Sequence, residues 1–79
     1  MDLNHVSVFV RVVELESFTA AAGQLGLPKS SVSRTVTRLE EDLGVRLLQR
    51  TTRKLHLTEA GQAYYERARL ALGGLEEAA

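Results

Sequence analysis

Apolar residues recur at steps of three and four along most of this chain, the spacing that places side chains on one face of an α-helix. The first run predicts a helix over residues 3–16, with Asp2 as its N-cap. Its apolar face is formed by Leu3, Val6, Phe9, Val10 and Val13. Because its valines are β-branched and lower helix propensity, we expect this helix to depend on packing against a core.

A second, shorter helix is predicted over residues 20–25, with Thr19 as its cap and Phe18 at its start. Its buried edge is expected to consist of Ala21, Ala22 and Leu25. Gly26 ends this helix, since glycine readily adopts the left-handed conformation that follows a helix. Pro28 prevents any continuation, because proline lacks a backbone N–H and restrains the residue before it.

A third helix is predicted over residues 29–43, and Gly44 ends it. Its apolar stripe consists of Val32, Val36, Leu39 and Leu43. The candidate DNA-facing residues lie off that stripe and are Lys29, Ser30, Ser31, Ser33, Arg34, Thr37 and Arg38. Two helices joined by a tight turn, here about residues 19–43, form a helix-turn-helix, whose second helix can enter the DNA major groove. A solvated surface helix can also carry such residues, so this face alone leaves DNA contact open.

After Gly44 the pattern changes from helical spacing to alternation. Residues 54–57 have strand period with Leu55 and Leu57 directed inward, so we predict a pair of short strands, or wing, over about residues 46–57. Arg50, Arg53 and Lys54 lie at its tip, where arginine suits phosphate or a minor groove. A solvated hairpin tip is the alternative interpretation.

The last helix is predicted over residues 59–79, with Thr58 as N-cap and Glu59 in the first turn. Its apolar stripe consists of Ala60, Tyr64, Ala68, Ala71 and Leu75. Such a stripe either folds back on the core or pairs with another chain. For the second case we expect dimerisation through Tyr64, Ala68, Ala71 and Leu75.

The formal net charge of the 79 residues is zero, but the charges are unevenly distributed. Residues 29–54 carry seven Lys or Arg against three Asp or Glu, a net charge of +4, and the remaining residues carry −4. Because a phosphate backbone responds to the local field, this basic third of the chain favours a nucleic-acid partner.

Composition also argues against several classes of protein. Cysteine is absent, and His5 and His56 have no metal-ligand spacing, so no disulfide, metal or cofactor is expected. No run approaches the ~18 apolar residues of a membrane span, and no signal peptide precedes the first helix, so we expect a cytoplasmic protein. No spacing sets a nucleophile beside a base, so an enzyme is not expected.

Together these motifs resemble the N-terminal domain of LysR-type transcriptional regulators, a winged helix-turn-helix family. The residues that carry the resemblance are Phe9, Val13-Glu14, residues 17–22, Leu25, Val32-Ser33-Arg34, Val36, Leu39-Glu40, residues 43–47, Arg50 and residues 57–61. The resemblance implies a mainly α fold with a three-helix core, a two-stranded wing and a long linker helix. It implies a DNA-binding domain at residues 1–58 and a dimerisation helix at residues 59–79.

The resemblance also implies roles for individual residues. Ser33, Arg34 and Arg38 correspond to DNA-facing positions of the recognition helix, and Arg50, Thr52 and Arg53 correspond to the wing. Family members bind imperfect inverted repeats as dimers or dimers of dimers, so the leading hypothesis is sequence-specific binding of double-stranded DNA. The alternative is a winged-helix module that dimerises and binds protein without DNA.

Two departures from the family pattern affect these expectations. The family usually has a capping Ser or Thr followed by Gln where this chain has Pro28-Lys29. Either Pro28 lies in the first turn, or Ser30 caps a helix that starts later. The family also continues into a large effector-binding domain, which is absent from this chain. The sequence therefore corresponds to an excised fragment or a truncated regulator, and it identifies no inducer.

Overall fold

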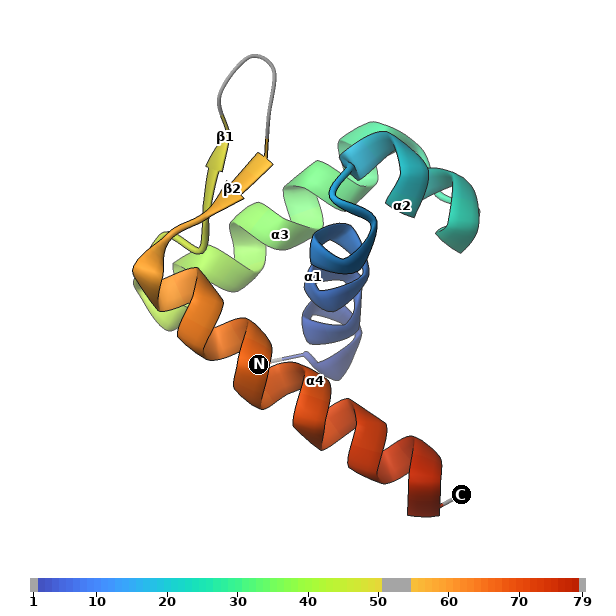
Figure 1. The fold of residues 1–79 in the computed structure, drawn as a ribbon. Helices are drawn as coiled ribbons and strands as arrows, with labels where there is room; N and C mark the ends of the chain where they lie inside the picture. Colours follow the sequence, from blue (N-terminus) through green and yellow to red (C-terminus); the bar gives the residue numbers. More distant parts are fainter. Residues whose placement is uncertain (1, 51–54, 79) are drawn as a thin grey trace.

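The computed structural model describes residues 2–50 and 55–78, and the side chains of residues 2–49 and 55–73. In these residues the element order is α1 (Leu3–Leu15), α2 (Phe18–Leu25), α3 (Lys29–Leu43), β1 (Leu48–Arg50), β2 (Leu55–Leu57) and α4 (Glu59–Ala78). Figure 1 shows α1, α2 and α3 packed together, with the two strands beside α3. Helix α4 crosses the bottom of the view, on the side of the domain away from α2. The predicted winged helix-turn-helix architecture is confirmed.

A single core joins all the helices to the first strand. Its fully buried side chains are Phe9, Val12, Val32, Val36, Leu39, Leu47 and Leu48. Helix α1 packs against α2, α3 and α4, and the rings of Phe9 and Tyr64 lie 5.8 Å apart at a tilt of 55°. Helix α1 thus contacts every other helix. This agrees with the expectation that its β-branched residues make it depend on packing against a core.

The second helix begins earlier than predicted. Glu16 adopts a left-handed conformation with φ of 53°, which turns the chain between α1 and α2 within one residue. Ser17 is then extended, and its hydroxyl accepts a hydrogen bond from the Ala20 N–H at 3.0 Å. The N-cap is therefore Ser17, and the prediction of Thr19 was wrong by two residues.

Two leucines predicted to be buried are exposed. Leu3 is 67% exposed, because the buried side of α1 begins only at Val6. Leu25 is 37% exposed, and the buried edge of α2 consists of Ala21 and Ala22 alone. These small side chains allow α2 to approach α1 and α3 closely, so the larger Leu25 is not needed to fill the contact.

The boundaries of the other elements agree with the sequence. Asp2 accepts a hydrogen bond from the Asn4 N–H at 2.8 Å and caps α1. Gly26 and Gly44 follow α2 and α3 with φ of 69° and 71°, the left-handed values predicted for them. The strands pair antiparallel, with Leu48 opposite Leu57, and both Leu55 and Leu57 are half-buried while His56 is exposed.

Candidate nucleic-acid interface

Helix α3 separates an apolar side from a polar one. Val32, Val36 and Leu39 are completely buried, which fixes the orientation of the helix about its own axis. The exposed side chains are Lys29, Ser30, Arg34, Thr37, Arg38, Glu41 and Asp42, while Ser31 and Ser33 are half-buried at the boundary. The residues that sequence spacing assigned to the DNA-facing side thus lie on the solvent-facing side or at its edge.

The first turn of α3 corrects both predicted alternatives for Pro28. Pro28 is itself the N-cap, with φ of −62° and ψ of 146°, and the helix begins at Lys29. Its carbonyl oxygen accepts hydrogen bonds from the N–H groups of Ser31 at 3.0 Å and Val32 at 3.2 Å. Because the helix begins at Lys29, Ser30 lies inside the first turn and is not the cap, and proline offers no side-chain oxygen to cap it.

Two threonine hydroxyls of α3 donate hydrogen bonds to backbone carbonyls four residues earlier in the helix. The Thr37 hydroxyl donates to the Ser33 carbonyl at 3.1 Å, and the Thr35 hydroxyl donates to the Ser31 carbonyl at 2.8 Å. A hydroxyl that donates in this way still has acceptor lone pairs. Thr37 therefore presents a fixed oxygen on the exposed side of the helix, beside the arginines.

Two arginines of α3 border a shallow hollow against the start of α1. The hollow has a volume of about 350 Å³ and is lined by His5, Arg34, Thr35, Thr37, Arg38 and Glu41. Within the part of the chain that the structure describes, Arg34 and Arg38 make no ion pair. Their charges are therefore available to an anion from outside the domain.

The wing contributes a second basic segment, although most of its predicted contacts fall outside the described residues. Thr52, Arg53 and Lys54 lie in the undescribed range, and Arg50 is described by its backbone only. Arg46, which was not among the predicted DNA-binding residues, is exposed just before β1. It lines a hollow of about 430 Å³ with Thr37, so a further cation lies beside the exposed side of α3.

Glu40 and Thr58 have positions that spacing did not single out. One oxygen of the Glu40 carboxylate accepts hydrogen bonds from the N–H groups of Leu47 at 2.8 Å and Leu48 at 3.1 Å. The Thr58 hydroxyl donates to the Arg46 carbonyl at 2.6 Å. Both residues carry the family resemblance, and Thr58 was predicted as a helix cap, but neither was assigned a contact with residues 46–48.

Helix α4 divides the predicted dimerisation residues between two environments. Ala68 is only 7% exposed and Tyr64 is half-buried against Phe9, so both pack on the core of their own chain. This desolvation raises the pKa of Tyr64 above its usual 10.0. Ala71 is exposed, and the side chain of Leu75 lies outside the described residues. Leu70, beside the predicted stripe, is 65% exposed.

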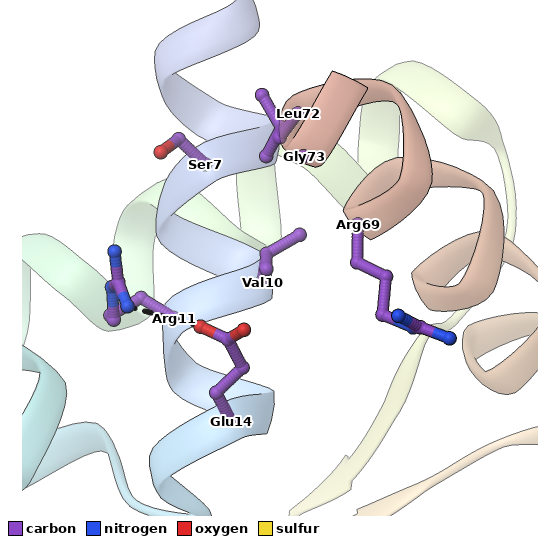
Figure 2. Close-up of a pocket in the computed structure, with 7 residues that line it drawn as sticks. All are labelled: Ser7, Val10, Arg11, Glu14, Arg69, Leu72 and Gly73. Atoms are coloured by element: carbon purple, nitrogen blue, oxygen red, sulfur yellow. Dashed lines mark hydrogen bonds and ion pairs between the residues drawn. The ribbon is translucent and has the colours of Figure 1, made fainter. Parts of the chain in front are cut away.

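A groove of about 390 Å³ lies between α1 and α4 and is separate from the basic side chains of α3. Figure 2 shows Val10 and Leu72 within it and Arg69 at its edge, with Arg11 bonded to Glu14 at 3.1 Å. Among the described residues, no group of three or more His, Asp or Glu side chains is arranged to hold a metal ion. Over the same ranges, none of the helices has the length and apolar composition needed to cross a bilayer.

Comparison with known proteins identifies close relatives in sequence. A family model for "Bacterial regulatory helix-turn-helix protein, lysR family" matches residues 3–62. An HTH-type transcriptional regulator from Xanthomonas campestris pv. campestris (strain 8004) is 57% identical over 77 residues, 98% of this chain and 22% of that protein. The HTH-type transcriptional activator AaeR from Escherichia coli (strain K12) is 51% identical over 75 residues, 95% of this chain and 24% of that protein. The chain thus spans about a quarter of the length of these curated relatives.

Two solved structures extend the likeness to three dimensions. The BenM DNA-binding domain, crystallised with catB site 1 DNA, has a TM-score of 0.92 and 39% identity, covering 98% of this chain and 86% of that one. The CbnR DNA-binding domain in its DNA complex has a TM-score of 0.90 and 36% identity, covering 99% of this chain and 90% of that one. Both matches include the helix-turn-helix, the wing and α4.

Proposed function

Because the chain belongs to the lysR family of bacterial regulatory helix-turn-helix proteins, we propose that it is the DNA-binding domain of a transcriptional regulator and binds double-stranded operator DNA sequence-specifically. In this proposal α3 lies in the major groove, and the wing lies on the backbone or in the minor groove. The observation that carries the proposal is the exposed side of α3, where Arg34 and Arg38 stand opposite three fully buried residues.

The residues of this interface have different tasks. Arg34 and Lys29 contact base edges, because guanidinium and ammonium groups match the acceptors that guanine presents in the major groove. The residues that position α3 on the DNA backbone are Ser30, Ser31, Ser33, Thr37 and Arg38. The residues that hold phosphates or enter the minor groove are Arg50, Thr52, Arg53 and Lys54. Supporting this division, Lys29 and Ser30 are exposed in the first turn of α3.

The second part of the proposal is that two copies dimerise through α4 and bind an inverted repeat. Since Ala68 is buried within one chain, the contact uses the outward side of the helix, where Ala63, Arg67, Leu70 and Ala71 are exposed. A two-fold dimer matches the symmetry of an inverted repeat.

This chain matches about a quarter of the length of its relatives, and we propose that the whole regulator has an effector-binding domain in the remainder. A regulator of bacterial promoters acts in the cytoplasm, and we assign that location to the whole protein. The relatives are named as transcriptional regulators, and we propose no reaction for this chain.

Selection of bound sequences from a pool of random duplexes tests the proposal. We expect enrichment of an inverted repeat whose affinity falls steeply with salt, with a slope of about −0.9 in log K against log salt for each phosphate contact. A chain that binds no duplex even at low salt would instead be a protein-interaction module. Enrichment without half-site symmetry would contradict the dimer while keeping DNA binding.

A further inference from the structure

The segment that leads from α3 into the wing is held by two side chains, one on α3 and the other at the residue before α4. On one side, a single Glu40 oxygen accepts the consecutive N–H groups of Leu47 and Leu48, at 2.8 and 3.1 Å. Glu40 belongs to α3 and is half-buried, at the flank between the apolar stripe and the exposed side. A charged acceptor makes stronger hydrogen bonds than a neutral one, so this carboxylate ties the start of β1 to α3.

Thr58, the residue before α4, holds the same segment from the other side. Its hydroxyl donates to the Arg46 carbonyl at 2.6 Å, and its N–H donates to the Leu47 carbonyl at 2.9 Å. The same hydroxyl accepts the Gly61 N–H at 2.9 Å and so caps the helix that begins at Glu59. One threonine therefore joins the backbone of residues 46–47 to the first turn of α4.

Gly61 allows this close approach. A Cβ atom at Gly61 would overlap the Leu47 carbonyl oxygen and lie 2.8 Å from its carbonyl carbon. The side chains of Leu47 and Leu48 are fully buried beneath the same segment. The first turn of α4 is thus in direct contact with the peptide that Glu40 holds from the other side.

We propose that Glu40 and Thr58 are positioning residues of a clamp, defined by these two side chains and the backbone of residues 46–48, that sets the wing and α4 in one orientation relative to α3. The strands pair over only three residues each, and a hairpin of that length does not keep a fixed orientation by itself. The inference rests on the proposed function, because it makes the phosphate contacts of the wing depend on Glu40. The base contacts of Arg34 do not depend on it.

Matched variants separate this role from general stabilisation and from charge. Glu40→Met removes the acceptor, whereas Glu40→Gln keeps an acceptor oxygen and removes the charge. Glu41→Gln removes the same charge from the neighbouring exposed residue of α3 and leaves the clamp intact. Thr58→Val removes the hydroxyl, and Thr58→Ser keeps it.

The first experiment measures hydrogen exchange of the Leu47 and Leu48 amides by NMR, without DNA. We expect exchange to be faster by about tenfold or more in Glu40→Met, which corresponds to the removal of a hydrogen bond to a charged acceptor. Glu40→Gln restores most of the protection, and Glu41→Gln does not change it. Unchanged exchange in Glu40→Met would overturn the clamp, and this experiment remains decisive even if the domain binds no duplex.

The second experiment measures the salt dependence of binding to the selected operator and to random DNA. We expect Glu40→Met and Thr58→Val to make the slope shallower by about 0.9 for each phosphate that the wing no longer neutralises. The ratio of operator to random affinity should stay within about twofold of the parent, and Glu40→Gln and Thr58→Ser should restore the slope. An unchanged slope, or a ratio that falls as far as the affinity itself, would overturn the inference.

Discussion

Helices α3 and α4 are both amphipathic, yet they leave different chemistry exposed. Within the described residues, Arg34 and Arg38 of α3 have no ion-pair partner, whereas Arg69 of α4 is paired with Glu66 at 3.2 Å. Helix α4 in turn exposes Leu70 at 65%, while the apolar residues of α3 are buried or half-buried. The exposed side of α3 thus presents two arginines without an ion-pair partner among the described residues, and that of α4 presents a leucine.

This difference indicates which partner suits each helix. Cations without an internal partner gain most from phosphates and base edges, because no existing ion pair must be broken. An exposed leucine on a helix gains from burial against another protein surface. The same chain therefore separates its proposed DNA contacts from its proposed protein contacts, and each can be changed alone.

The largest expected effect concerns how firmly α4 is joined to the domain. Gly61→Ala should destabilise the fold by about 3 kcal/mol, at the upper end for overpacking, because the added Cβ meets the backbone of Leu47. Gly73→Ala on the same helix meets nothing within 4 Å and should stabilise it by about 0.5–1 kcal/mol. Thermal unfolding of both variants measures the difference. Equal melting temperatures would show that α4 is not fixed at its start.

The second prediction compares an arginine of α3 with one of the predicted wing and one of α4. Arg34→Ala should remove about 1–3 kcal/mol of discrimination between operator and random DNA, because the variant cannot make a bidentate hydrogen bond to guanine. Arg53→Ala should instead weaken binding to both, and Arg69→Ala should leave the preference unchanged. Titration of each variant with operator and random duplexes provides the measurement. Operator preference that persists in Arg34→Ala would remove Arg34 from the base contacts.

Local signals account for what could be predicted about this fold. Helical spacing, left-handed glycines after residues 25 and 43, and strand alternation each depend on near neighbours. The choice between Ser17 and Thr19 as a cap depended on the left-handed turn at Glu16, which no local signal specified. Periodicity also identifies a face and not its extent, which is why Leu3 and Leu25 were placed in the core and are exposed.

The interface was predictable to the extent that it lies on one helix. Burial of Val32, Val36 and Leu39 determines that Arg34 and Thr37 face outward, as spacing indicated. The clamp was not predictable, because Glu40 and Thr58 meet through residues 46–48 only after the chain has turned. The position of Pro28 as the cap itself also required the backbone angles of the turn.

The third prediction tests the apolar side of α4. Leu70→Gln keeps helix propensity and removes an exposed apolar side chain, which a two-fold interface would bury once from each copy. Since Leu70 is already partly buried and a rim contact covers only part of the rest, each copy should lose well below the about 1.5–3 kcal/mol of full leucine burial, and self-association should weaken by about tenfold. Sedimentation across a concentration series measures this, with Leu25→Gln on α2 as the control. A parent protein that remains monomeric at high micromolar concentration would contradict the dimer.

The smallest effect concerns the half of α4 that packs on its own chain. Burial raises the pKa of Tyr64, so the unfolded chain loses this proton at a lower pH than the folded one. The stabilisation is complete below pH ~10, the unfolded pKa, and is lost as pH rises through the higher folded pKa. Melting temperature between pH 8 and 11, measured on dilute protein, should decline less in Tyr64→Phe than in the parent, and Tyr65→Phe should decline as the parent does. Equal declines of melting temperature in the parent and both variants would mean that Tyr64 is not desolvated within a single chain. That result would favour its predicted place at the dimer contact over its packing against Phe9.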